Sequence, residues 1–371
     1  MKGYFDYNAT TPLLPAAREA WLRASDAFWY NASGLYREGA GVHHQLELAR
    51  DRLGELIGAE PERIIFTSGA TEGNNAIIRK AAKQAQGASR VFSSSLEHPS
   101  LREPLRREWG ARVQELPTTV GGVCDLAGLE ERLAEGPTAL VTLMAANNEC
   151  GSLQPWPEAL RICRSQGVPF HVDAAQWLGK MPAQGLGECD YVTGSGHKFG
   201  GPKGIGFLVL RDEDEPLGFL SGGPQEGGRR AGTENYPAVE AMVTALEALT
   251  PQLGGLRQVQ AGFRESFIAR LRANLGPVRV IGEGAECLWN TVMFVAPQGD
   301  NRKWCGRLSQ AGFQISTGSA CSAIKDGSSV VLAALGATPE EMRRVLRISA
   351  GWGTTEQDWA DLAEAISHVQ I

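Results

Sequence analysis

Residues 168–176 read Val-Pro-Phe-His-Val-Asp-Ala-Ala-Gln, a short apolar run that leads directly into the carboxylate of Asp173. Similar runs at 64–67, 91–92 and 140–143 each precede a stretch with helical spacing, such as 71–85. Apolar residues also recur at helical spacing over 38–58, which predicts an amphipathic helix there. Strands that alternate with helices form a mainly parallel sheet covered by helices on both faces. We therefore predict an α/β fold from about residue 60 to residue 250.

The pattern changes after residue 250. Long helical patterns at 256–275 and 355–368 flank short strand-like runs at 278–281 and 291–295, and Arg347 is expected near the end of a helical run. This order predicts a smaller α+β domain, and a chain of 371 residues is long enough for two cores. We predict a large domain of residues 14–250 and a small domain that combines residues 1–13 and 251–371.

Composition and charge narrow the class of protein. Hydrophobic residues make up 43% and charged residues 21%, as in soluble globular proteins, and the net charge of −6 argues against a nucleic-acid surface. There is no signal-like apolar segment at the N-terminus, and the run 139–146 is too short to span a membrane. Seven cysteines without CxxC pairs suit a reducing cytoplasm and give no zinc pattern, so we expect a cytoplasmic protein with no metal.

Polar residues follow the predicted strands at five places. They are Ser68-Gly69-Ala70-Thr71, Glu97-His98, Asn147-Asn148, Asp173, and Ser195-Gly196-His197-Lys198. Ligands of open α/β sheets bind beyond the carboxyl ends of the strands. We therefore expect these five segments to meet at one crevice.

Two of these residues, together with the nearby Gln176, suit a pyridine-ring cofactor. Lys198 lies in a Gly-rich turn, where confinement lowers the pKa of a lysine that acts as a Schiff-base nucleophile; a plain turn with an exposed lysine is the alternative. Asp173 suits a protonated pyridine nitrogen, and Gln176 suits the hydroxyl of the same ring. An Asp after a strand is equally common as a helix N-cap.

The turn at 68–72 and His98 each allow two interpretations. The turn precedes a helix and suits a phosphate, or it is a capping box with Ser68 or Thr71 as the N-cap. The imidazole of His98 suits stacking on a pyridine ring and proton transfer, or it is a structural histidine.

Cys321 lies among Gly, Ser and Ala in the segment 315–323, which favours a mobile loop that carries a thiolate to a substrate. An inert buried thiol is the alternative. We expect that inert state for the other six cysteines, at positions 124, 150, 163, 189, 287 and 305.

Taken together, these segments resemble the cysteine desulfurases of the class V aminotransferase family, of the NifS/IscS type. The resemblance runs over nearly the whole chain. It is carried by residues 5–12, 67–72, 97–98, 147–149, 171–176, 195–198, 229–235 and 318–321. The segments Gly318-Ser319-Ala320-Cys321 and 229–235 (Arg-Arg-Ala-Gly-Thr-Glu-Asn) are the ones most specific to desulfurases, whereas Ser-Gly-His-Lys occurs in relatives of other activity.

The resemblance implies a fold type I enzyme that uses pyridoxal 5'-phosphate. It implies that Lys198 binds the cofactor covalently, with Asp173 at the ring nitrogen, Gln176 near the ring oxygen and His98 over the ring. The phosphate group would be held by Ala70, Thr71, Ser195 and His197, and by Thr233 from the partner subunit of a homodimer. Asn148 and Arg347 would bind the substrate carboxylate.

The implied reaction converts L-cysteine to L-alanine and leaves sulfur as a persulfide on Cys321 for an acceptor protein, such as an iron–sulfur scaffold. Lys198, Cys321 and His98 are the expected catalytic residues.

The sequence also departs from the family pattern. The family's second arginine after Arg347 is replaced by Trp352, and the segment 323–329 differs as well. The alternatives are a selenocysteine lyase, another class V enzyme with the same cofactor, and a non-catalytic sulfur-relay protein.

Overall fold

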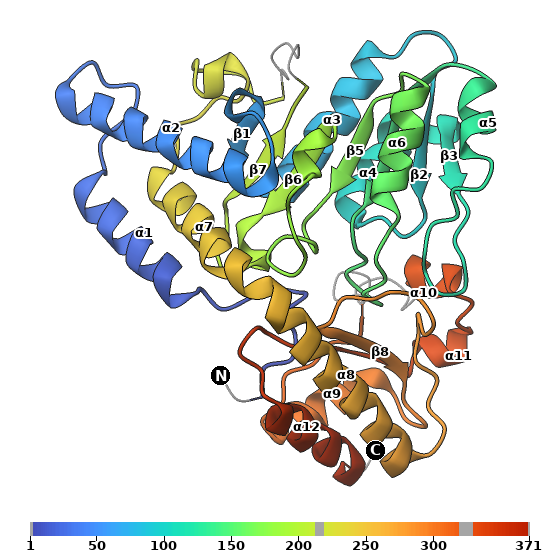
Figure 1. The fold of residues 1–371 in the computed structure, drawn as a ribbon. Helices are drawn as coiled ribbons and strands as arrows, with labels where there is room; N and C mark the ends of the chain where they lie inside the picture. Colours follow the sequence, from blue (N-terminus) through green and yellow to red (C-terminus); the bar gives the residue numbers. More distant parts are fainter. Residues whose placement is uncertain (1–2, 212–218, 319–328, 370–371) are drawn as a thin grey trace.

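The computed structural model describes residues 3–211, 219–318 and 329–369. Its larger sheet has seven strands in the order β1-β7-β6-β5-β4-β2-β3 (Figure 1). These strands are β1 (Ile64–Thr67), β2 (Arg90–Ser94), β3 (Val113–Leu116), β4 (Thr138–Met144), β5 (Phe170–Asp173), β6 (Tyr191–Ser195) and β7 (Gly206–Val209).

The strand directions explain why polar residues gather at one edge of this sheet. Strands β3, β2, β4, β5 and β6 are paired in parallel, and β7 runs antiparallel to both β6 and β1. Strand β1 consequently points the same way as β2, β4, β5 and β6. The prediction of a mainly parallel sheet is confirmed, and the carboxyl ends of these five strands lie at the same edge.

Helices cover both faces of the sheet, because successive strand residues point to opposite faces. Val91 and Leu140 pack with helices α3 and α4, whereas their neighbours Phe92 and Val141 join the core on the opposite face. The helices of this part are α1 (Pro15–Ala27), α2 (Arg37–Ile57), α3 (Ala70–Gln84), α4 (Pro99–Glu108), α5 (Leu129–Ala134), α6 (Trp156–Ser165) and α7 (Tyr236–Leu249).

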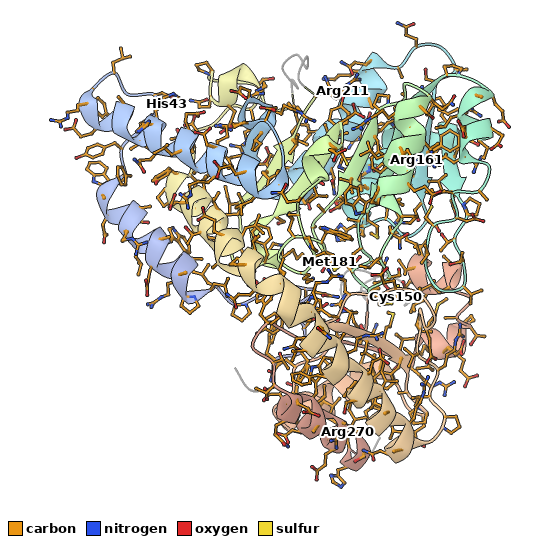
Figure 2. The ribbon with its side chains drawn as sticks, viewed as in Figure 1. His43, Cys150, Arg161, Met181, Arg211 and Arg270 are labelled. Atoms are coloured by element: carbon orange, nitrogen blue, oxygen red, sulfur yellow. The ribbon has the colours of Figure 1, made fainter. Side chains whose placement is uncertain are left out.

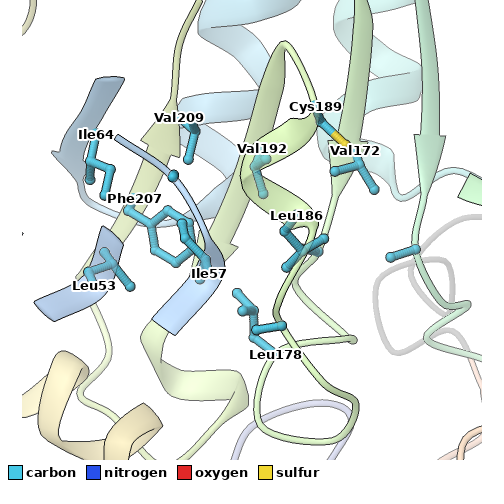
Figure 3. Packing of buried hydrophobic residues seen from close by; sticks show 14 of the residues in the cluster. Leu53, Ile57, Ile64, Val172, Leu178, Leu186, Cys189, Val192, Phe207 and Val209 are labelled. Atoms are coloured by element: carbon cyan, nitrogen blue, oxygen red, sulfur yellow. The ribbon is translucent and has the colours of Figure 1, made fainter. Parts of the chain in front are cut away.

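Helix α2 confirms the amphipathic helix predicted at 38–58. Its residues Leu53 and Ile57 lie beside Phe207 of β7 in the core (Figure 3). The helix ends at Gly58, whose φ of 73° is a left-handed conformation that glycine adopts at little cost.

A second, two-stranded antiparallel sheet is formed by β8 (Thr291–Val295) and β9 (Val345–Ser349). Helix α8 follows α7 along nearly the same line and leads to this sheet (Figure 1). Phe5, Phe267 and Trp359 pack together in its separate core, so the N-terminal segment joins the later part of the chain. The helices here are α8 (Leu253–Leu275), α9 (Asn301–Gln310), α10 (Val330–Ala334), α11 (Pro339–Met342) and α12 (Glu356–His368).

Two expectations about this part were wrong. Residues 278–281 form no strand, because only Val280 makes a bridge, to Phe294, and Gly282 follows in a left-handed conformation. Arg347 lies in β9 and not near the end of a helix; Arg347 and Ser349 interrupt the short apolar run that would have revealed this buried strand. The predicted boundary falls at Thr250–Gln252, a short 3₁₀ turn between α7 and α8, and the division into domains stays a prediction.

None of the helices within the described residues is both long enough and apolar enough to cross a membrane. The cytoplasmic location stays a prediction.

Candidate active site

A cavity of about 620 Å³ lies where the carboxyl ends of the sheet strands meet the smaller sheet. All five predicted polar segments contribute to its wall, as does Arg347 from β9. The predicted site residues that line it are Ala70, Thr71, His98, Asn148, Asp173, Gln176, Ser195, His197, Lys198 and Arg347. The structure therefore brings together residues that lie up to 277 positions apart in the chain.

Lys198 enters the cavity from a 3₁₀ turn, Gly196–Lys198, that directly follows β6. Its Nζ donates to the carbonyl oxygens of Asn8 at 2.7 Å and Ala9 at 2.8 Å. The turn needs glycine at position 200, where φ is +82° and a Cβ atom would lie 2.4 Å from a side-chain carbon of Leu14. Lys198 is thus held at the cavity wall, and the alternative of an exposed lysine in a plain turn does not hold.

Asp173 ends β5 and its side chain is held by donors on both oxygens. Oδ1 accepts from the backbone N–H of Ala175 at 2.9 Å, and Oδ2 accepts from Nδ2 of Asn74 at 2.8 Å. The residue is only 6% exposed, and a turn follows it, so it is not the N-cap of a helix. A carboxylate fixed in this way suits a cationic ring nitrogen.

The turn at 68–71 leads into α3, whose N-cap is Gly69 and has no side-chain cap. The alternative of a capping box with Ser68 or Thr71 as the N-cap therefore does not hold; Glu72 instead accepts from the backbone N–H of Ser68 at 2.8 Å. A Cβ atom at Gly206 of β7 would lie 2.6 Å from the Cα atom of Gly69, so the turn packs directly against the strand. The start of this 15-residue helix lines the cavity and can bind an anion.

Two histidines in the cavity wall have lowered pKa values. Burial lowers the pKa of His98, against the opposing effect of Asp173. Burial, helped by Lys198 and Lys203, lowers the pKa of His197 to about 4. Both imidazoles are therefore neutral at pH 7.

Arg347 is 2% exposed and is fixed by three oxygens. Nη2 donates to Oδ1 of Asp6 at 2.6 Å, and Nη1 donates to the carbonyl oxygens of Asn148 at 3.0 Å and Gly318 at 2.8 Å. Within the described residues the buried Nε has no hydrogen-bond partner. The structure brings Arg347 and Asn148 together, as their shared predicted role requires.

Buried ionisable groups that the sequence analysis left without a role surround these residues. Nζ of Lys180 donates to Oε1 of Gln176 and, at 3.1 Å, to Oδ1 of Asn8. Burial lowers the pKa of Lys180 well below its ordinary value, and it raises the pKa values of Glu97 and Glu149, which line the cavity. Lys180 lies four positions after Gln176, and Glu97 and Glu149 are next to predicted site residues in the sequence. These positions alone do not predict that the three side chains are buried.

The remaining predicted residues lie elsewhere. Cys321 lies outside the described residues. Thr233 is exposed and does not line the cavity of the single chain, so its contribution to a partner subunit stays a prediction.

The other six cysteines have raised pKa values because they are buried or half-buried. The pKa rises to about 12 for Cys124 and to about 11 for Cys150, and Cys150 is labelled in Figure 2. Within the described ranges no group of His, Cys, Asp and Glu could hold a metal ion.

The chain is similar to known proteins over almost its full length. A cysteine desulfurase of Rhodobacter capsulatus is 36% identical over 357 residues, which cover 95% of this chain and 92% of that protein. Among solved structures, a NifS-like protein has a TM-score of 0.89 at 29% identity and covers 99% of this chain and 98% of its own. SspA in complex with cysteine has a TM-score of 0.81 at 29% identity, over 94% of this chain and 98% of its own. The sequence model of the aminotransferase class-V family matches residues 3–362, and the chain belongs to this family.

Proposed function

We propose that this protein is a cysteine desulfurase that converts L-cysteine to L-alanine and holds the sulfur as a persulfide on Cys321. One observation carries the proposal: Lys198, Asp173 and Arg347 line a single cavity although they come from three different strands or strand ends. The similarity to named cysteine desulfurases, and to a structure that binds cysteine, supports the choice of substrate.

The cavity fits pyridoxal 5'-phosphate. The start of α3 at Ala70 and Thr71, together with Ser195 and His197, would hold the phosphate, and Asp173, with a donor on each oxygen, would pair with the ring nitrogen. Gln176 would lie near the ring oxygen, and Lys198 would bind the cofactor covalently. When bound, this cofactor supplies an electron sink that stabilises negative charge at the substrate Cα.

The remaining wall residues would bind the amino acid. The guanidinium of Arg347, with an unused Nε–H in the described structure, and the side chain of Asn148 would bind the carboxylate. Lys198, released from the cofactor, would move the proton at the substrate Cα, and His98 would lie over the ring.

The sulfur step consumes one thiol and one cysteine and needs no external oxidant. The Cys321 thiolate attacks the substrate sulfur, so that an S–S bond forms and the C–S bond breaks. The carbon retains the electron pair and takes up a proton, which gives L-alanine and the enzyme persulfide. Burial keeps the six described thiols protonated, and this supports Cys321 as the nucleophile.

We also propose a homodimer that passes sulfur to an acceptor protein, such as an iron–sulfur scaffold. Apolar side chains are exposed together near the start of α2: Trp29 is 68% exposed, and its ring stacks on Tyr30 at 4.1 Å, with Leu35 and Tyr36 nearby in the chain. An exposed apolar cluster of this kind supports a protein interface.

The test of the proposal is to incubate the purified protein, loaded with pyridoxal 5'-phosphate, with L-cysteine and a thiol reductant. Alanine and sulfide should form in equal amounts. Turnover of selenocysteine without any turnover of cysteine would indicate a selenocysteine lyase, and the absence of both would contradict an enzymatic function of this kind.

A further inference from the structure

A buried chain of hydrogen bonds joins Asp173 to His98 by way of Asn74 and Ser100. Nδ2 of Asn74 donates to Oδ2 of Asp173 at 2.8 Å and to Oγ of Ser100 at 2.9 Å. The same Oγ lies 2.8 Å from Nδ1 of His98. Asn74 is fully buried on α3, and the other groups come from β5 and from the start of α4. Buried polar groups that lose their partners are costly, so this chain fixes its members in place.

The orientation of the Asn74 amide follows from its neighbours. A carboxylate only accepts hydrogen bonds, so the nitrogen of the amide must face Asp173. Its oxygen then faces the hydroxyl of Thr193, which donates to it at 2.7 Å. Both hydrogens of the amide nitrogen are therefore used, one by Asp173 and one by Ser100.

The backbone of Ser100 determines the tautomer of His98. A backbone N–H can only donate, and that of Ser100 lies 3.1 Å from Nδ1 of His98, which makes Nδ1 an acceptor. Oγ of Ser100 already accepts from Asn74, so its own hydrogen can point at the same Nδ1. His98 is also the N-cap of α4, and a proton on Nδ1 would break this cap and place a cation at the positive end of the helix.

We propose that Asn74 is a positioning residue that orients Asp173 and, through Ser100, holds His98 as the neutral tautomer with its proton on Nε2. The imidazole then offers an N–H at Nε2, where it can donate a hydrogen bond or a proton but has no lone pair to accept one. The consequence for turnover rests on the proposed function, whereas the state of the imidazole does not. The sequence analysis gave His98 a role in proton transfer but did not distinguish between donating and accepting a proton.

The charged groups around His98 define what a variant should do. The carboxylate of Asp173 favours the imidazolium, whereas Lys198 and Arg102 disfavour it, as does burial. Asn74→Asp keeps the shape of the side chain but replaces both donated hydrogen bonds with acceptors and adds a negative charge. The Ser100 hydroxyl would then turn to the new carboxylate, and His98 would lose a donor to Nδ1. Protonation of His98 should become easier.

Nitrogen NMR of histidine side chains in the protein with pyridoxal 5'-phosphate bound tests the tautomer directly. His98 should show a protonated Nε2 and a bare Nδ1 at pH 7, with a titration midpoint below the ordinary histidine pKa of about 6.5. A proton on Nδ1, or an ordinary titration near pH 6.5, would overturn the proposal. Because this spectrum requires no turnover, a protein that fails to convert cysteine can still show the predicted tautomer.

The variants test the role of Asn74. In Asn74→Asp the titration midpoint of His98 should rise by about one pH unit, the size expected for a new opposite charge at close range. Asn75→Asp is the matched control, because its side chain instead donates to the carbonyl oxygens of Thr71 and Ser100. No shift in Asn74→Asp, or an equal shift in both variants, would overturn the role of Asn74.

Ser100 provides a second test if Asn74→Asp does not fold. Ser100→Ala keeps the backbone N–H, so the Nε2–H tautomer should persist, but the midpoint of His98 should rise because the hydroxyl donor is lost. Ser100→Thr restores a hydroxyl and should restore the midpoint. An unchanged midpoint in Ser100→Ala would show that the hydroxyl does not connect Asn74 to His98, and it would contradict the proposal.

Discussion

Arg347 of β9 donates a hydrogen bond of 2.6 Å to Oδ1 of Asp6, which lies more than three hundred positions earlier in the chain. Asp6 also pairs with Ser349 through a backbone bridge, so the N-terminal segment runs beside β9. One nitrogen of the guanidinium is thereby fixed by the carboxylate, which orients the rest of the group toward the cavity wall that it lines.

This geometry predicts the effect of Arg347→Lys. The lysine keeps the charge but cannot reproduce the planar arrangement of donors, so the KM for cysteine should rise about tenfold, equivalent to about 1.4 kcal/mol. The cofactor absorbance should persist. Arg344→Lys, which alters a neighbouring arginine that does not line the cavity, is the control. An unchanged KM in Arg347→Lys would exclude Arg347 as the carboxylate anchor.

The position of Lys198 predicts the site of cofactor attachment. Borohydride reduction of the protein loaded with pyridoxal 5'-phosphate should fix the cofactor to Lys198, which peptide mass mapping would identify. Lys203 also lines the cavity and provides the internal comparison. An adduct on Lys203, or no adduct at all, would contradict the proposed role of Lys198.

Lys180 should make stability depend on pH. Burial lowers its pKa in the folded protein well below the ordinary 10.5, so between the two pKa values the unfolded chain binds a proton that the folded chain does not. The contribution of Lys180 to stability therefore rises with pH through this window. Lys180→Met removes this dependence, and its urea midpoint relative to the unaltered protein should be highest at neutral pH and fall toward pH 10.

The exposed Lys303→Met is the matched control and should show no such trend. A difference between Lys180→Met and the unaltered protein that stays constant with pH would mean that Lys180 keeps its proton in the fold. The loss of its hydrogen bonds to Gln176 and Asn8 should remain visible at high pH, where only that effect is left.

The parts of the fold that sequence predicts well are those with regular apolar spacing. Helix α2 and strands β1, β4 and β5 lie close to their predicted places because their buried residues recur at regular intervals or form short apolar runs. Strand β9 was missed because Arg347 and Ser349 interrupt its apolar run, and because its partner β8 lies about fifty residues earlier. Pairing between distant segments leaves no local pattern.

The same distinction applies to the site. Asp173, Lys198 and His98 follow strands of one direction, so their approach to one another could be predicted from the order of the elements. The link through Asn74 and Ser100 could not, because it depends on side-chain orientations within two different helices. The complete burial of Lys180 likewise results from packing between distant segments.

The central claim is that Cys321 receives the sulfur of cysteine, and mass mapping of the persulfide tests it most directly. The protein, loaded with pyridoxal 5'-phosphate and given L-cysteine without reductant, should carry one labile persulfide per chain, on Cys321. Cys321→Ala should bind the cofactor and cysteine but form no alanine, whereas Cys305→Ala, which removes a half-buried thiol, should form it normally. A persulfide on Cys305 or Cys150, or normal turnover by Cys321→Ala, would contradict the account.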